Sequence, residues 1–532
     1  MKNYKAKSNC CGMYEQEIID KIIEQRGIDD VEHFLNPTED DLLPLDSLPN
    51  ISEAFEILDR HIKYETKIGV LFDTDTDGIT SGTIITRYLL NFVQHIDIFI
   101  DKGKMHGLVE QDLEKFMHLD LLIIVDSLDK NIKQYKILKE NGVDIVVLDH
   151  HIVDKNIQYK NYVTLITSNV DYDNPQLSGA GVVWKFCKYM DEQYLEEYAD
   201  ELIDLAACGI VADMMDMTVM ENRYIVSQGL KQIYNPAIKK IVGSFDFNST
   251  GISFSIAPLI NASNRMDCNK SAVNAFLADD NKEVLKYVKE LKQCKENQNI
   301  EVDRLMPDVL EQCENQINNK MICVFIDTPY GISGLLGNKL LEKYQRPILV
   351  LKDCEDNYSG SMRAMGMDDF MKVCNDSGLA EANGHELASG ITIIKNNFND
   401  FITYIEEYLQ DLELHNDIKY ADVEINTSDI TSTLIDNIKQ IDKVSGEGFK
   451  PVRFLVNDIS DFEVSDMSKG KHLVLKVGEI LQFIKWNFTG SFEEYEDLSL
   501  LGDQVQAVVS LDNGFFGRKF VLKAICDDLE VA

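Results

Sequence analysis

The sequence predicts an α/β protein with a parallel-sheet domain, a long connecting helix, a second α/β domain and a C-terminal β-barrel. Short apolar runs alternate with helical segments from residue 68 to residue 167, which is typical of a parallel sheet with crossover helices. Charged helical stretches follow, and strand-like runs dominate beyond residue 416. At 532 residues, the chain is also too long for one hydrophobic core.

Bulk composition is typical of a globular protein, with 45% hydrophobic residues. No apolar run reaches the ~18–20 residues of a membrane span, and residues 1–5 lack the apolar stretch of a secretory signal. The 11 cysteines include no C-x-x-C pair, so neither a zinc ribbon nor a disulfide framework is indicated. We therefore expect a cytoplasmic protein that does not associate with membranes.

Residues 1–66 are expected to form an N-terminal helical segment. Amphipathic stretches cover Glu15–Gln25, Asp30–Leu35 and Ile51–Tyr64. Prolines separate them, and the residue before a proline disfavours helix. This segment is predicted to serve packing and spacing.

Residues 67–269 are expected to form the parallel-sheet domain. Its apolar runs are short, and helical periodicity lies between several of them. The predicted strands are Ile68–Phe72, Ile96–Ile100, Leu119–Val125, Val143–Leu148 and Tyr162–Thr167, and the predicted helices are Ile79–Phe92, Gln111–His118 and Ile132–Asn141.

Acidic residues and histidines follow the strands of this sheet. Ligands of open α/β sheets bind at the carboxyl ends of the strands, so these side chains should share one edge. One aspartate after a strand is commonly a turn former or helix cap, but their repetition indicates a shared Mg²⁺ or Mn²⁺ site. The residues are Asp73, Asp75, Asp77, Asp126, Asp149, His150 and His151.

A further carboxylate, Asp213, ends the apolar helix predicted over Ile203–Met215. Burying a carboxylate without a partner is costly, and a metal would supply that partner. The net charge of −38 argues against a general polyanion binder. A nucleic-acid enzyme of this charge must concentrate its basic residues or use divalent metal as positive charge.

Residues 270–320 are expected to form the connecting helix, and residues 321–415 the second α/β domain with strands over Met321–Asp327 and Pro347–Lys352. Two glycine-containing motifs in this domain, Ser359–Arg363 and 383–390, combine glycines with Ser361, Arg363, Gly384 and His385. Glycine beside serine, arginine and histidine suits a phosphate cradle, with arginine giving a two-pronged contact.

Residues 416–532 are expected to form a small barrel. Asn513-Gly514 is predicted to be the turn of a hairpin. Such barrels bind single strands through aromatic stacking and a basic groove. The predicted strands are Val452–Val456, Leu473–Val477, Ile480–Trp486, Val505–Leu511 and Phe520–Ile525, and the candidate contacts are Phe483, Lys485, Trp486, Phe488, Phe515, Phe516, Arg518 and Lys519.

These motifs resemble, in order and spacing, those of the DHH phosphoesterase superfamily, and most closely its RecJ branch of 5′-to-3′ single-strand-specific DNA exonucleases. The resemblance rests on Asp-x-Asp-x-Asp-Gly, Asp126, Asp149-His150-His151 and Gly-Ile-Val-Ala-Asp213. It extends to the stretches 26–37, 177–182 and 258–265. It implies a DHH domain, a DHHA1 domain at 321–415 and an OB-fold at 416–532.

The resemblance also implies a mechanism that releases 5′-mononucleotides in DNA repair, recombination or replication. Two Mn²⁺ or Mg²⁺ ions would be bound, and His151 would contact the scissile phosphate or assist the leaving group. Partners would be single-stranded DNA and a single-strand-binding protein or helicase, with the chain itself a monomer. The implied metal ligands are Asp75, Asp77, Asp126, His150 and Asp213, supported by Asp73 and Asp149; the implied substrate contacts are Arg265, Ser361, Arg363, Gly384, His385 and Arg518.

Four positions depart from the family pattern, and none of them is a proposed metal ligand: Leu128, Leu259, Asn264 and Asn383. Two other functions therefore stay open. One is a DHH phosphodiesterase that cuts short oligonucleotides or cyclic dinucleotides, and the other is a non-catalytic replication scaffold. The C-terminal barrel argues for a long single strand, and the complete metal ligands argue against a scaffold.

Overall fold

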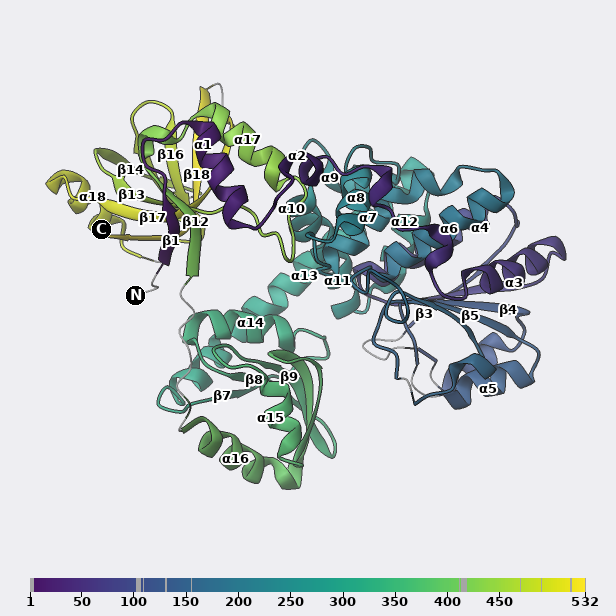
Figure 1. Cartoon of the computed structure of the whole chain (residues 1–532). Coiled ribbons are helices and arrows are strands. Elements are labelled where there is room, and N and C mark those ends of the chain that lie inside the picture. The colour runs from purple at the N-terminus through teal and green to yellow at the C-terminus, as the bar shows by residue number, and fades with distance from the viewer. Residues whose placement is uncertain are drawn as a thin grey trace.

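The computed structural model describes residues 4–101, 107–108, 110–129, 132–154, 156–410, 412, 419–468, 470–488, 490–516 and 519–531. Its strands form three separate sheets, which lie in three bodies (Figure 1). The long helix α13 (Asn281–Glu314) leads from the body with the parallel sheet to the second α/β body. No helix in the described part combines the length and apolarity that a membrane crossing requires.

The first sheet is fully parallel, with strand order β3-β2-β4-β5-β6, and confirms the predicted parallel-sheet domain. Its central strands are buried on both faces, as parallel sheets require. Apolar side chains of α4 and α6 cover one face and those of α5 the other. The bounds are β2 Ile68–Phe72, α4 Thr76–Leu89, β3 Asp97–Ile100, β4 Leu121–Val125, α5 Ile132–Glu140, β5 Asp144–Asp149, β6 Thr164–Thr167 and α6 Gly179–Tyr194.

Helices complete this body and connect it to the next. The helix predicted over Gln111–His118 is a 3₁₀ helix, Glu110–Phe116. Helix α13 is continuous through Pro307, and its 34 residues give a length of about 51 Å. The remaining helices are α7 Ile203–Ala212, α8 Met220–Gly229, α9 Pro236–Val242, α10 Ser249–Gly251, a π-helical turn Ile252–Ile256, α11 Ala257–Arg265 and α12 Asn269–Leu277.

The second sheet has the order β10-β11-β9-β8-β7 and is mixed, because only β7 and β8 are parallel. Helices α15 and α16 pack on it. The bounds are β7 Ile322–Phe325, α14 Ser333–Tyr344, β8 Ile348–Asp353, β9 Asn357–Arg363, α15 Phe370–Asp376, β10 Ala380–His385, β11 Ala388–Ile394 and α16 Phe398–Gln410.

The third sheet has the order β1-β12-β13-β17-β18-β16-β15-β14. Strands β13 and β14 are consecutive in the chain and are separated by a bend at Asp461. In the strand order β13-β17-β18-β16-β15-β14, however, they lie at opposite ends. Counted together as one bent strand, β13 and β14 thus close a five-stranded barrel with β15, β16, β17 and β18, which is consistent with the expected OB-fold. The bounds are β12 Lys419–Ile425, α17 Ser432–Asp442, β13 Phe454–Ile459, β14 Phe462–Met467, β15 His472–Val477, β16 Leu481–Lys485, α18 Phe492–Leu501, β17 Val505–Phe516 and β18 Lys519–Val531.

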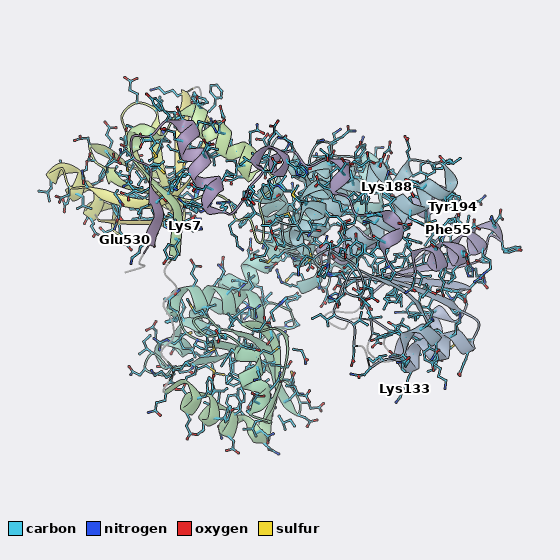
Figure 2. The ribbon with its side chains drawn as sticks, in the orientation of Figure 1. Lys7, Phe55, Lys133, Lys188, Tyr194 and Glu530 are labelled. Atoms are coloured by element: carbon cyan, nitrogen blue, oxygen red, sulfur yellow. The ribbon has the colours of Figure 1, made fainter. Side chains whose placement is uncertain are left out.

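Two features of this sheet differ from the sequence predictions. The N-terminal segment is not entirely helical, because β1 (Tyr4–Asn9) pairs in parallel with β12; Lys7 of β1 and Glu530 of β18 belong to the same body (Figure 2). The predicted hairpin turn at Asn513-Gly514 is wrong, since both residues are paired within β17. Lys439 and Asp436 of α17 bind Asn513 and thus hold it in the strand.

The N-terminal helices join the barrel to the parallel-sheet body. The buried Arg223 guanidinium lies 3.6 Å from the ring centroid of Phe34 and 5.0 Å from that of Phe449. It donates to the carbonyl oxygen of Val444 at 2.9 Å, and Arg26 forms an ion pair with Asp422. Because these contacts join three chain segments, they fix the barrel relative to the sheet. The N-terminal helices are α1 Glu15–Gln25, α2 Val31–Leu35 and α3 Ile51–Lys63.

Candidate metal centre and anion site

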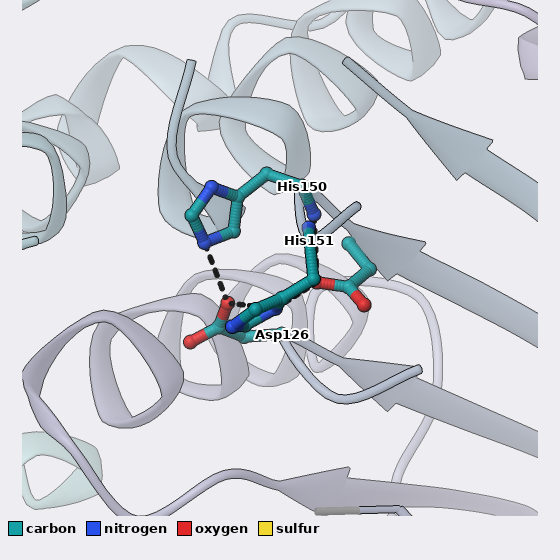
Figure 3. A group of neighbouring side chains, drawn as sticks. Asp126, His150 and His151 are labelled. Carbon is teal, nitrogen blue, oxygen red and sulfur yellow. Dashed lines mark hydrogen bonds and ion pairs between the residues drawn. The ribbon is translucent and has the colours of Figure 1, made fainter. Parts of the chain in front are cut away.

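The structure brings the predicted metal-binding residues together at the carboxyl edge of the parallel sheet. His150 Nε2 lies 3.3 Å from Asp126 Oδ1 (Figure 3). It also lies 3.3 Å from Asp213 Oδ2 and 3.7 Å from Asp77 Oδ2. Three overlapping groups each place their ligand atoms within 4.8 Å of one another. The metal cluster, as we name it, comprises Asp73, Asp75, Asp77, Asp126, Asp149, His150, His151 and Asp213.

Asp77 is held by the N-terminus of α6. Its two carboxylate oxygens accept hydrogen bonds from the backbone amides of Gly179 (2.7 Å) and Ala180 (3.0 Å). A helix N-terminus stabilises negative charge. Gly209 of α7 is also required, because a Cβ there would lie 2.3 Å from Asp77 Oδ1. The close packing of α4, α6 and α7 therefore positions this ligand.

Asp149 and His151 form an ion pair behind the cluster. His151 Nδ1 donates to Asp149 Oδ1 at 2.8 Å, and the Leu128 amide donates to Asp149 Oδ2 at 2.8 Å. Burial opposes the charged imidazolium, but the Asp149 hydrogen bond and charge raise the pKa of His151 to about 9. His151 is consequently a half-exposed cation at neutral pH.

Asp126 points most directly to a bound cation, because one of its buried carboxylate oxygens has no hydrogen-bond partner among the described residues. It is buried, with a left-handed backbone (φ 54°), and its Oδ1 accepts no hydrogen bond among the described residues. Burial raises its pKa well above the ordinary value, and the neighbouring charges of Asp77 and Asp75 raise it further. An orphaned buried carboxylate oxygen is rare unless a cation completes its site.

Burial is also the largest cause of the pKa shifts of Asp213 and His150. Burial, together with the charges of Asp77 and Asp75, raises the pKa of Asp213 to about 8. Burial lowers the pKa of His150, so its imidazole is neutral, which is the form that binds metal. Clustered carboxylates with a neutral imidazole are a donor set that Mn²⁺ and Mg²⁺ accept. The residues present therefore fit divalent cations.

These pKa shifts predict how metal stabilises the protein at different pH values. In the metal-free protein the folded pKa of Asp213, about 8, exceeds its unfolded value. Its contribution to stability is therefore complete at acidic pH and is lost as the pH rises through 8. Bound Mn²⁺ removes this loss, so the gain in Tm on adding Mn²⁺ should be larger at pH 8 than at pH 6. Thermal unfolding with and without Mn²⁺ at pH 6 and pH 8 measures this gain in Tm. An equal gain at both pH values contradicts the prediction.

Helix α11 connects the metal cluster to a second site. Thr76, between two aspartates of the cluster, donates from its hydroxyl to Asn261 Oδ1 at 3.1 Å. Arg265 lies four residues further along the same helix, hence one turn away on the same face. The predicted phosphate-binding arginine is thus about 6 Å along the helix axis from Asn261, which contacts Thr76 beside the metal cluster.

The anion site, as we name it, comprises Arg265, Ser333, Ser361 and Arg363. The hydroxyls of Ser333 and Ser361 lie 2.9 Å apart, and both residues are buried. Arg363 donates to Asn338 Oδ1 at 2.6 Å. Helix α14 begins here, and its N-cap residue provides no side-chain hydrogen-bond acceptor. The first backbone amides of α14 therefore face this site without that acceptor.

The second predicted substrate motif lies two strands away from this site. His385 is paired with Ala388, which is paired with Arg363, so the three residues form one row across β10, β11 and β9. Gly384 is in the left-handed region (φ 136°) and packs against Ser389. His385 is exposed and its strand ends there. Both motifs therefore belong to one edge of the second sheet.

Only part of the predicted aromatic surface of the barrel is exposed. Phe515 is 74% and Trp486 45% exposed, whereas Phe483 is buried. Phe488 packs against Phe492 at 5.2 Å. The described residues do not include Arg518, the side chain of Phe516 or the turn between β17 and β18. Phe515 and Trp486 are hence the described aromatic candidates for stacking.

Sequence reasoning missed the backbone groups and amides that organise these sites. Ser178-Gly179-Ala180 at the start of α6 carried a signal, because serine before small residues is typical of a helix N-terminus. Asn261 and Asn338 carried none, since their roles depend on contacts between segments far apart in the chain.

Comparison with known proteins agrees with this geometry. Residues 67–210 match the model of the DHH family, N-terminal domain. A Bacillus subtilis protein named as an SPbeta prophage-derived single-strand DNA-specific exonuclease is 30% identical over 450 residues, covering 77% of this chain and 78% of that protein. The single-stranded-DNA-specific exonuclease RecJ of Bacillus subtilis is 24% identical, covering 84% of this chain and 59% of its own length.

The fold also matches a solved structure. The crystal structure of RecJ in complex with Mn²⁺ from Thermus thermophilus superimposes with a TM-score of 0.79 and 20% identity. The match covers 100% of this chain and 80% of that one. All three bodies consequently have counterparts in that structure.

Proposed function

The chain belongs to the RecJ family of single-stranded-DNA-specific exonucleases and is a metal-dependent enzyme of that class, and on this premise we propose its direction and products. It degrades single strands from the 5′ end in the 5′-to-3′ direction and releases 5′-mononucleotides, in DNA repair, recombination or replication. The single observation that supports this proposal is helix α11. Its Asn261 accepts a hydrogen bond from Thr76, which lies between two aspartates of the metal cluster, and Arg265 lies one helical turn further along. A chain end held at the anion site would present its first internucleotide phosphate to the metal cluster.

Each group of residues has a separate task in this proposal. The anion site binds the terminal 5′-phosphate through Arg265, Ser361 and Arg363, and Gly384 and His385 clamp the strand beside it. Divalent metal, when bound, lowers the pKa of water and offsets the charge of the phosphoryl oxygens. The charged imidazolium of His151 contacts the scissile phosphate and stabilises its charge. We assign as metal ligands Asp75, Asp77, Asp126, His150 and Asp213, with Asp73 and Asp149 as supporting residues.

Each of the three bodies has a separate role in this proposal. We assign catalysis to residues 67–269, spacing to the helix within 270–320, end binding to 321–415 and strand binding to the barrel at 416–532. The exposed Phe515 and Trp486 supply stacking surfaces for a long strand. A short-oligonucleotide phosphodiesterase would gain little from them. A single-strand-binding protein or helicase is the partner class we propose, with the exonuclease itself a monomer.

The first test uses end-labelled single-stranded DNA with Mn²⁺, offered with a 5′-phosphate, with a blocked 5′ end and as a duplex. We expect mononucleotides from free single-stranded 5′ ends alone. Cleavage restricted to very short oligomers would instead indicate the phosphodiesterase. The absence of cleavage with every divalent metal would indicate the scaffold.

A further inference from the structure

Four basic residues of α11, α13, α14 and β9 lie close enough for their charges to interact, and we name them the cation cluster: Arg265, Lys295, Lys339 and Arg363. Arg265, Lys295 and Lys339 form no ion pair and no side-chain hydrogen bond among the described residues. The chain carries 90 acidic and 52 basic residues, so a group of cations without a carboxylate partner is unexpected. Such a group indicates an anionic ligand.

Contacts from four elements place these residues around the anion site. The Arg265 carbonyl oxygen accepts from the Gly331 amide at 3.0 Å, in the loop that leads into α14. Arg363 binds Asn338, and Lys339 is the next residue of α14. Lys295 lies on α13, which packs against α11, the helix that ends at Arg265. The site is thus bounded by α11, α13, α14 and β9.

The electrostatics agree with this placement. Burial lowers the pKa of Lys295, and the positive charges of Arg265 and Lys339 lower it further. Burial also lowers the pKa of Arg363, with a further contribution from the charge of Arg265. Because these cations repel one another, the cluster is costly without an anion.

The charge of the cluster exceeds what one terminal phosphate needs. A terminal phosphate carries about −1.5 to −2 at neutral pH, and Arg265 and Arg363 with the α14 amides balance it. In the proposed mode of binding, the next phosphate of the strand lies at the metal cluster. Lys295 and Lys339 therefore have no phosphate of an ordinary monophosphorylated strand to bind.

We propose that Lys295 and Lys339 bind the β- and γ-phosphates of a 5′-triphosphorylated strand end, so that the enzyme also degrades such ends. This inference rests on the proposed 5′-to-3′ function. Water adds to the first internucleotide phosphorus and the bond from that phosphorus to the 3′ oxygen breaks, with a proton passing to that oxygen. The products are a nucleoside 5′-triphosphate and a strand with a 5′-monophosphate.

The test compares matched single-stranded oligonucleotides that carry a 5′-monophosphate or a 5′-triphosphate. We expect the wild-type enzyme to release intact nucleoside triphosphate as the first product from the triphosphorylated strand. K295Q and K339Q should each lower kcat/KM on that strand about 10-fold or more, because each removes a charge-assisted contact. Their effect on the monophosphorylated strand should be several times smaller, and K295R should restore cleavage of the triphosphorylated strand.

Lys292, exposed on the same helix, supplies the matched control K292Q, which should cleave both strands like the wild type. Three outcomes would overturn the inference: a triphosphorylated strand that is not cut, an initial release of pyrophosphate or phosphate, or equal losses on both strands in K295Q and K339Q. Failure of the proposed function itself is distinguishable, because the monophosphorylated strand would then also resist the wild-type enzyme.

Discussion

His150→Ala abolishes strand cleavage, with a fall in kcat of about 10³-fold or more, while the fold is retained. The imidazole contacts Asp77, Asp126 and Asp213 and is the neutral nitrogen donor of the metal cluster. Bound metal supplies several kcal/mol of charge stabilisation, and about 4 kcal/mol corresponds to a 10³-fold change in rate. Mononucleotide release from 5′-phosphorylated DNA under saturating Mn²⁺ measures the effect.

The control for this variant is His95→Ala. His95 is 82% exposed and pairs with Asp97 at the surface, so its loss should leave activity unchanged. Circular dichroism and Tm in the absence of metal should be close to wild type for both variants. Turnover by His150→Ala within 10-fold of wild type would refute the metal assignment.

Arg265→Ala should produce the second-largest loss, about 10- to 150-fold in kcat/KM on 5′-phosphorylated strands. A hydrogen bond to a charged group contributes about 1.5–3 kcal/mol, and the variant would lose such a bond to the terminal phosphate. Strands with a 5′-hydroxyl lack the phosphate that this residue binds, so their slower cleavage should change much less. The ratio of the two kcat/KM values measures the effect.

Two further variants sharpen this prediction. Arg265→Lys keeps the charge but loses the two-pronged geometry, and should recover only part of the preference for the phosphate. Arg60→Ala removes a half-exposed arginine of α3 that pairs with Asp144 at the amino end of β5, away from the metal cluster, and should leave both substrates unaffected. A loss of equal size on phosphorylated and hydroxyl ends would remove Arg265 from end recognition.

Residues that end a strand were predictable from sequence, because the strand pattern itself places them in space. Asp73, Asp126 and Asp149 follow buried apolar runs, and parallel strands bring their carboxyl ends to one edge. Asp213 was predictable for a related reason, since an apolar helix leads directly to it. Four strands of this sheet begin one or two residues later than predicted, which leaves the site unaffected.

Features that depend on tertiary pairing were not predictable in this way. Asn513-Gly514 has the composition of a tight turn, but contacts from α17 keep it extended within β17. The amides of α14 carry no side-chain signature, because any residue supplies a backbone N–H and no side chain caps this helix. Lys295 and Lys339 are ordinary lysines of amphipathic helices until the fold brings them beside Arg265.

The pairing of β1 with β12 also constrains the order in which the protein folds. Tyr4 is synthesised long before its partner Lys419, by roughly 20–80 s at ordinary rates of translation. During that interval β1 is an unpaired strand that could join another chain. Its exposed lysines, Lys5 and Lys7, discourage such pairing. The third sheet is therefore completed after both α/β domains, and β1 must stay soluble while they fold.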